Sequence, residues 1–180
     1  MTKSSQILLH ACCAICSGHP IELLKEMGYK PIVYFCNPNL YPKEEFYKRL
    51  EAQKSLCENL GCELIIEDYN PQVFIDAASG FEKEPEKGKR CSKCFEIRLK
   101  QSAQKAKELG VENFTTSIVI SPHKNFELIS AIGKKISEEY NINYQAINFK
   151  KHDGLLKTNQ IANKLNLYRQ KYCGCRYSIR

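Results

Sequence analysis

The stretch I-L-L-H-A-C-C-A-I-C-S-G, residues 7–18, indicates the fold of this chain most clearly. Its apolar run predicts a buried first strand over Gln6–Ala11, and a helical spacing of apolar residues follows over Pro20–Met27. Three cysteines stand where the strand should turn toward the helix: Cys12, Cys13 and Cys16. The fold therefore places thiols in its first strand-to-helix loop.

The same alternation of strand and helix continues along the chain. Further strands are predicted over Pro31–Cys36, Cys62–Glu67, Phe114–Ile120 and Asn143–Phe149. Further helices are predicted over Lys43–Leu60, Pro71–Ala78, Phe95–Leu109, Phe126–Glu139 and Asn159–Tyr168, with a loop over Gly80–Arg90. This order predicts an α/β fold: one doubly wound, mostly parallel, Rossmann-like sheet in a single domain over 1–180.

Ligands of such sheets bind beyond the carboxyl ends of the strands. The predicted loops at that edge are Ala11–His19, Cys36–Tyr41, Tyr69–Asn70, Ser121–Asn125 and Lys150–Gly154. The three N-terminal cysteines belong to the first of these loops, so we expect them in a ligand-binding site.

Composition narrows the class of protein. The chain has 180 residues, 43% apolar and 26% charged, which is ordinary for a globular protein. The apolar run Ile7–Leu9 is too short for a signal peptide or a membrane span, which predicts a cytoplasmic protein without membrane contact. Ten cysteines are then not expected to form a disulfide framework, which leaves metal binding, redox chemistry or burial.

Net charge is +7, and the excess is concentrated near the C-terminus. From about residue 150 onward, eight Lys and Arg residues face one acid, Asp153. Such a basic segment can bind nucleic acid phosphates, or it can be a solvated helix face. Charge alone leaves both interpretations open.

The cysteines fall into three motifs: Cys12-Cys13-x-x-Cys16, Cys91-x-x-Cys94 and Cys173-x-Cys175. Two thiolates separated by one turn can converge on one metal, and four sulfur ligands suit Zn²⁺ or an iron–sulfur cluster. Adjacent ligands fit a zinc knuckle poorly, which favours iron–sulfur. The three isolated cysteines are expected to be small buried hydrophobes: Cys36, Cys57 and Cys62.

The candidate catalytic residues are Cys173, Cys175, His123 and Asp153. Gly174 gives the backbone freedom to bring Cys173 and Cys175 together, either as an easily reduced disulfide or as two further metal ligands. His123 is a candidate proton donor, whereas His10 is expected to be buried and hydrogen-bonded. Asp153 is a candidate base or hard metal ligand, with a helix cap as the favoured interpretation.

Several long motifs in one order resemble the QueH-type epoxyqueuosine reductases, nearly end to end. They are H-A-C-C-A-I-C (10–16), F-C-N-P-N-L-Y-P (35–42), E-P-E-K-G-K-R-C-S-K-C-F-E-I-R-L (84–99), T-T-S-I-V-I-S-P-H-K-N (115–125) and L-Y-R-Q-K-Y-C-G-C (167–175). One departure is Ile15, where the family usually has proline.

The resemblance implies a function and a cofactor. Members of the family reduce epoxyqueuosine to queuosine at the wobble position of tRNAs with GUN anticodons, the last step of queuosine biosynthesis, without cobalamin and with an external electron donor. Their fold is similar to the adenine nucleotide α-hydrolases. By position, Cys12, Cys13, Cys91 and Cys94 correspond to ligands of a [4Fe-4S] cluster, and Cys173 and Cys175 to a redox-active pair. An additional mononuclear iron would share some of these cysteines, with Cys16 a further candidate ligand.

Two other functions fit part of the sequence. A tRNA-thiolating enzyme of the same fold would need a Gly/Ser-rich phosphate loop after the first strand, where this chain has cysteines. A zinc-stabilised RNA-binding module without catalysis would explain the charge and the Cys91–Cys94 pair. It would not explain the adjacent cysteines at 12–13 or the pair at 173 and 175.

Overall fold

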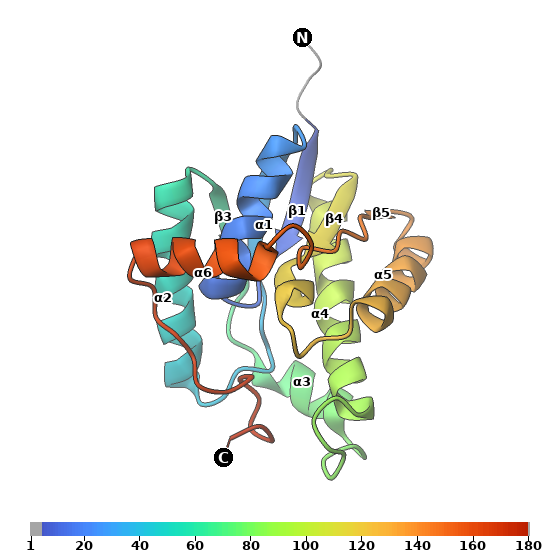
Figure 1. Cartoon of the computed structure of the whole chain (residues 1–180). Helices are drawn as coiled ribbons and strands as arrows, with labels where there is room; N and C mark the ends of the chain where they lie inside the picture. The colour runs from blue at the N-terminus through green and yellow to red at the C-terminus, as the bar shows by residue number, and fades with distance from the viewer. Residues whose placement is uncertain (1–4, 180) are drawn as a thin grey trace.

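The computed structural model describes residues 5–179. Five strands of this part of the chain form one sheet, in the order β3-β2-β1-β4-β5 (Figure 1). The strands are β1 (Gln6–His10), β2 (Lys30–Phe35), β3 (Glu63–Ile66), β4 (Asn113–Thr116) and β5 (Asn143–Tyr144). Every neighbouring pair is parallel; Leu8, for example, pairs with Ile32 on one side and Phe114 on the other. The predicted doubly wound parallel sheet is confirmed.

In the described part of the chain, six α-helices connect and cover the strands: α1 (Ala14–Glu26), α2 (Lys43–Leu60), α3 (Pro71–Ala78), α4 (Lys89–Glu108), α5 (Phe126–Tyr140) and α6 (Gly154–Lys164). Helix α1 packs against α2 and α6, and α4 packs against α5. Right-handed crossovers place these two groups on opposite faces of the sheet. The predicted bounds of α2 and α3 are confirmed.

The first helix begins earlier than predicted. It starts at Ala14 and runs through Pro20, the first residue of the predicted helix. Pro20 lacks the N–H that would bond to the Cys16 carbonyl, and its ring crowds that carbonyl; packing of α1 against α6 offsets this cost. Cys16 therefore lies in the first turn of a helix rather than in a loop.

Two predicted strands are shorter in the structure. The segment predicted as Phe114–Ile120 is a strand only to Thr116, and Ser117–Ile120 forms a 3₁₀ turn (η1). The Thr116 hydroxyl causes this change of direction by accepting a hydrogen bond from the Ile118 amide. The last strand ends at Tyr144 rather than Phe149, because it lies at the sheet edge and turns away after Gln145 bonds to the Phe114 carbonyl.

Two predicted helices are displaced. Helix α4 begins at Lys89, six residues before the predicted Phe95, so both Cys91 and Cys94 lie within its first two turns. Helix α6 spans Gly154–Lys164 instead of Asn159–Tyr168. It ends where Asn166 adopts a positive φ of 49° and the Leu167 amide bonds back to Ala162.

Most of the predicted buried polar and sulfur groups are in the core. Cys36 and Cys57 are buried, but Cys62 is only partly buried, so its predicted burial is wrong. His10 is buried and hydrogen-bonded as predicted, with its two ring nitrogens near the Thr116 hydroxyl and the Cys36 carbonyl. Burial, together with the charge of nearby Arg98, lowers the pKa of His10 to about 3, so the ring is neutral.

The C-terminal segment returns to the carboxyl edge of the sheet. After α6 the chain runs down past α2 and ends below the sheet, on the side away from the N-terminus (Figure 1). The strand order reverses between β1 and β4, the place where doubly wound sheets bind ligands. Within residues 5–179, none of the helices combines the length and apolar character needed to cross a membrane.

Candidate metal centre and active-site cavity

A cavity of about 360 Å³ opens at this reversal of strand order. Its walls come from the loop after β1, the segment after β4 and the C-terminal segment, and include Cys12, Cys13, Ile118, His123, Lys124 and Cys173. Ligand pockets are about 300–1,000 Å³, so the cavity can hold a group the size of a nucleoside.

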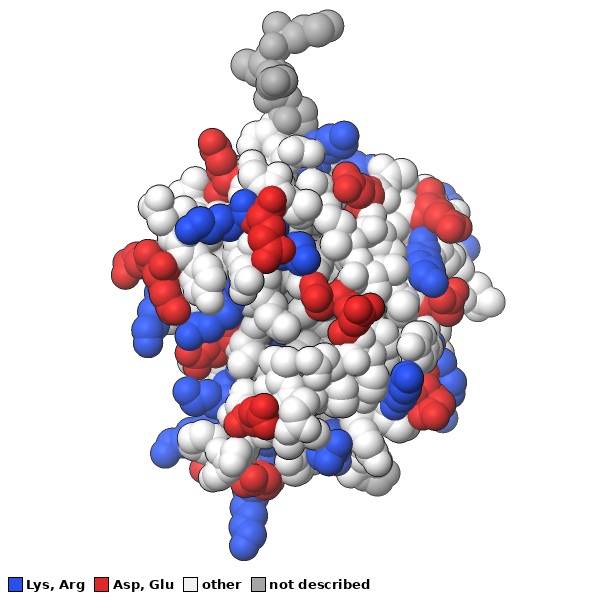
Figure 2. Space-filling model, turned by 180° about the vertical axis from the view of Figure 1, so that it is seen from behind, with Lys and Arg blue, Asp and Glu red and all other residues white. Residues whose placement is uncertain are grey.

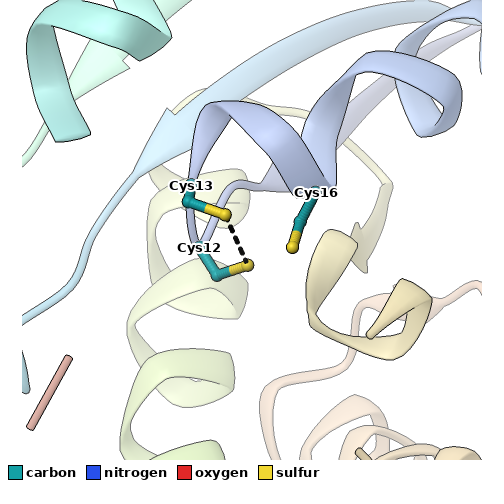
Figure 3. Close-up of side chains that lie close together, drawn as sticks. All are labelled: Cys12, Cys13 and Cys16. Carbon is teal, nitrogen blue, oxygen red and sulfur yellow. Dashed lines mark hydrogen bonds between the residues drawn. The ribbon is translucent and has the colours of Figure 1, made fainter. Parts of the chain in front are cut away.

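Three thiols converge at one side of the cavity. The sulfur atoms of Cys12, Cys13 and Cys16, which we call the triad, all lie within 4.8 Å of one another. Figure 3 shows them pointing toward a common centre from the end of the β1 loop and the first turn of α1, with 3.9 Å between the Sγ atoms of Cys12 and Cys13. The structure thus brings Cys16 into the site.

Without a metal, the triad favours a single thiolate, on Cys12. Hydrogen bonds from Cys13 and Cys16 lower the pKa of the Cys12 thiol well below its usual value, and Arg98 acts in the same direction. In turn, the hydrogen bond to Cys12 raises the pKa of Cys13, and the same neighbour raises that of Cys16. Three thiolates here require a cation, because only a bound metal offsets their mutual repulsion.

Arg98 supplies a buried positive charge beside the thiols. Its side chain, which also lines the cavity, belongs to a residue only 5% exposed. It donates to the Asn37 side-chain oxygen at 2.8 Å and lies 3.8 Å from the Cys94 sulfur. Its Nε has no hydrogen-bond partner among the described residues, and the charges that raise its pKa most are those of the Cys94, Cys12 and Cys173 sulfurs. A buried cation without a carboxylate favours an anionic occupant nearby.

The other four predicted cysteines, which we call the second group, lie outside the triad, and no three of them come as close together. Cys94 and Cys175 are buried in one small apolar cluster with Phe74, while Cys91 is half-buried and Cys173 exposed. Burial raises the pKa of Cys94 to about 11, although the Arg98 charge opposes this. All ten cysteines are free thiols, so a disulfide between Cys173 and Cys175 stays a prediction.

Lys124 links this second group to the cavity. Its ammonium lies 3.2 Å from the Cys173 sulfur. Burial lowers the pKa of Lys124, but the Cys173 and Cys91 sulfurs outweigh it, so the net shift is upward. Its neighbour His123 also lines the cavity, as predicted. Lys124 is thus a second titratable side chain on this wall, next to His123.

Asp153 lies away from the cavity wall. It is exposed at the residue before α6, and it is not among the residues that line the cavity. It occupies the N-cap position of α6, as the favoured interpretation expected, but its side chain makes no capping hydrogen bond to the helix. Its backbone has a positive φ of 60°, which turns the side chain away from the amides it would cap.

Two polar contacts to the triad could not be anticipated. The Gln170 side-chain amide donates to the Cys13 sulfur at 2.9 Å, and the Ser117 hydroxyl lies 3.6 Å from the Cys12 sulfur. Both residues are far from the triad in sequence. Hydrogen bonds to ligand sulfurs tune the potential of an iron–sulfur cluster.

The donor set of the cavity suits a soft metal. Three thiols at mutual contact, with hydrogen bonds to two of them, match structural or redox sites for zinc or iron–sulfur. Among the described residues, no other three Cys, His, Asp or Glu side chains come as close together. The triad is therefore the candidate metal centre.

Comparison with known proteins identifies the family. The sequence model of the family described as "Epoxyqueuosine reductase QueH" matches residues 7–180. This chain belongs to that family. Curated proteins of that name include one from Streptococcus pyogenes serotype M1, 36% identical, with 97% of this chain and 70% of that protein covered. Another, from Dehalococcoides mccartyi, is 33% identical, with 96% of this chain and 92% of that protein covered. The chain is thus an oxidoreductase, as expected, which excludes the non-catalytic module.

Solved structures agree on the fold. The U34-tRNA thiolase NcsA from Methanococcus maripaludis, solved with its [4Fe-4S] cluster, matches with a TM-score of 0.61 at 16% identity, covering 99% of this chain and 63% of that one. A predicted subunit of tRNA methyltransferase from Methanocaldococcus jannaschii matches with a TM-score of 0.58 at 13% identity, covering 87% and 76%. At these identities the likeness establishes the Rossmann-like fold alone.

Proposed function

We propose that this chain reduces epoxyqueuosine to queuosine at the wobble position of tRNAs with GUN anticodons. The reaction adds two electrons and two protons to the epoxide and yields an alkene and water. Membership of the QueH family supports this proposal, and the single structural observation that carries it is the convergence of the triad on the wall of a nucleoside-sized cavity. The electrons come from an external reductant, and no cobalamin takes part.

The triad residues Cys12 and Cys13 would supply two of the four thiolates of a [4Fe-4S] cluster, with Cys16 an alternative ligand that their closeness supports. Cys91 and Cys94 stay proposed as the other ligands. An additional mononuclear iron would find soft donors in the second group, where Cys173 and Cys175 are also the proposed redox pair. When bound, the cluster would pass single electrons to the substrate.

The charged residues of the cavity suit an RNA substrate. Apart from Arg49, which is paired with Glu45, three basic side chains and one acid line it: Arg98, Lys124, Lys171 and Glu86. On the opposite face of the molecule from Figure 1, acidic and basic side chains are interspersed around a broad uncharged area, so neither charge dominates there (Figure 2). We expect the anticodon phosphates at the cavity edge and on the basic segment that begins at about residue 150.

Two residues are proposed to deliver protons to the departing oxygen. His123 and Lys124 lie side by side on the cavity wall, and Lys124 also holds the Cys173 sulfur. Asp153, the remaining predicted catalytic residue, would need tRNA binding to bring it near the substrate. The reaction as a whole is expected in the cytoplasm, where the tRNA is.

Product analysis tests this function. Anaerobically prepared and reduced protein is mixed with tRNA that carries epoxyqueuosine, and the digested nucleosides are separated by mass. Queuosine should form at the expense of epoxyqueuosine, and Cys13→Ala should abolish it while Cys57→Ala does not. Unchanged epoxyqueuosine with iron-loaded wild-type protein and a competent reductant would refute the proposal.

A further inference from the structure

A buried ion pair on α2 faces the C-terminal segment. The Arg49 Nε donates to a Glu45 carboxylate oxygen at 2.8 Å, and the two side chains are 3% and 7% exposed. A buried pair adds little net stability by itself, because removing both charges from water costs about as much as their attraction returns. The role of the pair is indicated instead by the other hydrogen bonds that Arg49 and Glu45 make.

Those remaining groups all bind the C-terminal segment. The two terminal nitrogens of Arg49 donate to the main-chain carbonyls of Tyr172 and Cys173, each at 3.0 Å. The second oxygen of Glu45 accepts the Tyr168 hydroxyl at 2.8 Å. A guanidinium holds its donors in a rigid planar fork, so it fixes both carbonyls in one geometry.

The turn that follows leaves no room for adjustment. Gly174 has a φ of 124°, and its carbonyl accepts the Tyr41 amide at 2.8 Å. A Cβ at this position would lie 2.4 Å from Leu40 and 2.9 Å from Arg49, so only glycine fits. The turn is thus packed directly on the guanidinium.

This packing separates two thiols that are only two residues apart. Cys173 is exposed, lines the cavity and meets Lys124. Cys175 is 7% exposed and belongs to the apolar cluster with Phe74 and Cys94. The sulfur of Cys173 therefore faces the cavity, whereas the sulfur of Cys175 lies in the apolar cluster.

We propose that Arg49, oriented by Glu45, is a positioning residue that fixes the Cys173-Gly174-Cys175 turn, so that Cys173 faces the substrate cavity while Cys175 stays buried. The role rests on the proposed function, because it assigns the turn to the same reaction site. Arg49 takes no part in electron or proton transfer.

Thiol protection tests the positioning without any substrate. Full-length, anaerobically prepared protein is treated with iodoacetamide, and the alkylation rate of Cys175 is followed by peptide mass. Arg49→Met should raise that rate by at least about tenfold, because the turn opens locally, and Arg49→Lys should raise it less. The matched control is Lys54→Met, which removes the same charge from the same helix at an exposed pair with Glu51. It should leave Cys175 protected.

Kinetics separate positioning from substrate binding. With epoxyqueuosine-containing tRNA, Arg49→Met should lower kcat by about tenfold or more with little change in KM, and Arg49→Lys should recover part of kcat. Equal Cys175 protection in wild type and Arg49→Met would overturn the proposal, as would a Lys54→Met variant that opens as readily. If wild type shows no reductase activity, the alkylation result still decides the positioning role.

A milder variant covers the case in which Arg49→Met does not fold. Tyr168→Phe removes one hydroxyl from an exposed residue and leaves the ion pair intact. It should raise the alkylation rate of Cys175 by a few-fold relative to wild type. An unchanged rate in this folded variant would count against the proposal.

Discussion

The side-chain amide of Gln170 donates a hydrogen bond of 2.9 Å to the sulfur of Cys13, across 157 positions of sequence. The contact closes the C-terminal segment over the triad. It also places the amide dipole of Gln170 beside the Cys13 sulfur, which we propose as a cluster ligand. The contact should therefore affect the reduction potential of the cluster.

Removing this dipole should make the centre harder to reduce. Gln170→Leu keeps the side-chain volume but loses the donor, so the reduced, more negative state is less stabilised. The midpoint potential, measured by anaerobic dye titration, should fall. Gln104→Leu, on the exposed side of α4, is the control and should leave it unchanged. An equal potential in Gln170→Leu would show that the contact does not reach the metal.

Lys171 lines the cavity and is otherwise exposed, so it is available to a phosphate. Lys171→Ala should weaken tRNA binding, and the slope of log affinity against log salt should become shallower by about one. Filter binding at several salt concentrations measures both. Lys135→Ala, an exposed lysine on α5, serves as the comparison and should keep the wild-type slope. A wild-type slope in Lys171→Ala would place the phosphates elsewhere.

Acid should destabilise the fold through His19. Its side chain is buried in α1, and its Nε2 has no hydrogen-bond partner among the described residues. Burial, with the charge of Lys157, lowers its pKa, so the unfolded chain binds the proton more readily than the folded one. The stability is therefore present above about pH 6.5 and is lost as pH falls, by up to about 1.4 kcal/mol per pH unit.

Urea unfolding of metal-free protein at pH 7.5 and 5.5 checks this dependence. The free energy of unfolding should fall less steeply in His19→Gln than in wild type. Parallel pH profiles for the two proteins would mean that His19 is protonated equally in both states.

Gly154 marks the place where α6 joins the core. A Cβ there would lie 1.7 Å from the Phe149 carbonyl oxygen, which is main chain and cannot yield. Gly154→Ala should lower the free energy of unfolding by about 1–3 kcal/mol or more, measured by urea titration. A Cβ at Gly18 would lie nearest to the Ile161 side chain, at 3.0 Å, which can shift, so Gly18→Ala should cost less. Equal stability of Gly154→Ala and wild type would contradict the docking of α6.

The sequence predicted the sheet well because its signals are local. The apolar run before Cys12 and the glycine that ends α2 at residue 61 each mark an element boundary by their own chemistry. Boundaries decided by distant contacts were missed. Pro20 suggested a helix start, but packing of α1 on α6 extends the helix to Ala14.

The same distinction applies to the site. Cysteine spacing was enough to predict a thiol centre, whereas the inclusion of Cys16 depends on where α1 begins. Arg98 and Gln170 lie within quoted motifs and Arg49 does not, but no local pattern indicates which group any of the three contacts. Arg49 and Gln170 contact segments more than one hundred positions away, and Arg98 contacts Asn37, 61 positions away. These contacts exist only in the folded chain.

The content of iron and acid-labile sulfide in anaerobically prepared protein tests the central claim most directly. Wild type should be brown and hold about four sulfide ions per chain with at least as much iron. Cys13→Ala should lose most of both, whereas Cys57→Ala, which changes a buried cysteine away from the cavity, should keep them. A colourless, zinc-loaded wild type, or full iron and sulfide in Cys13→Ala, would contradict the assignment of the triad as an iron–sulfur centre.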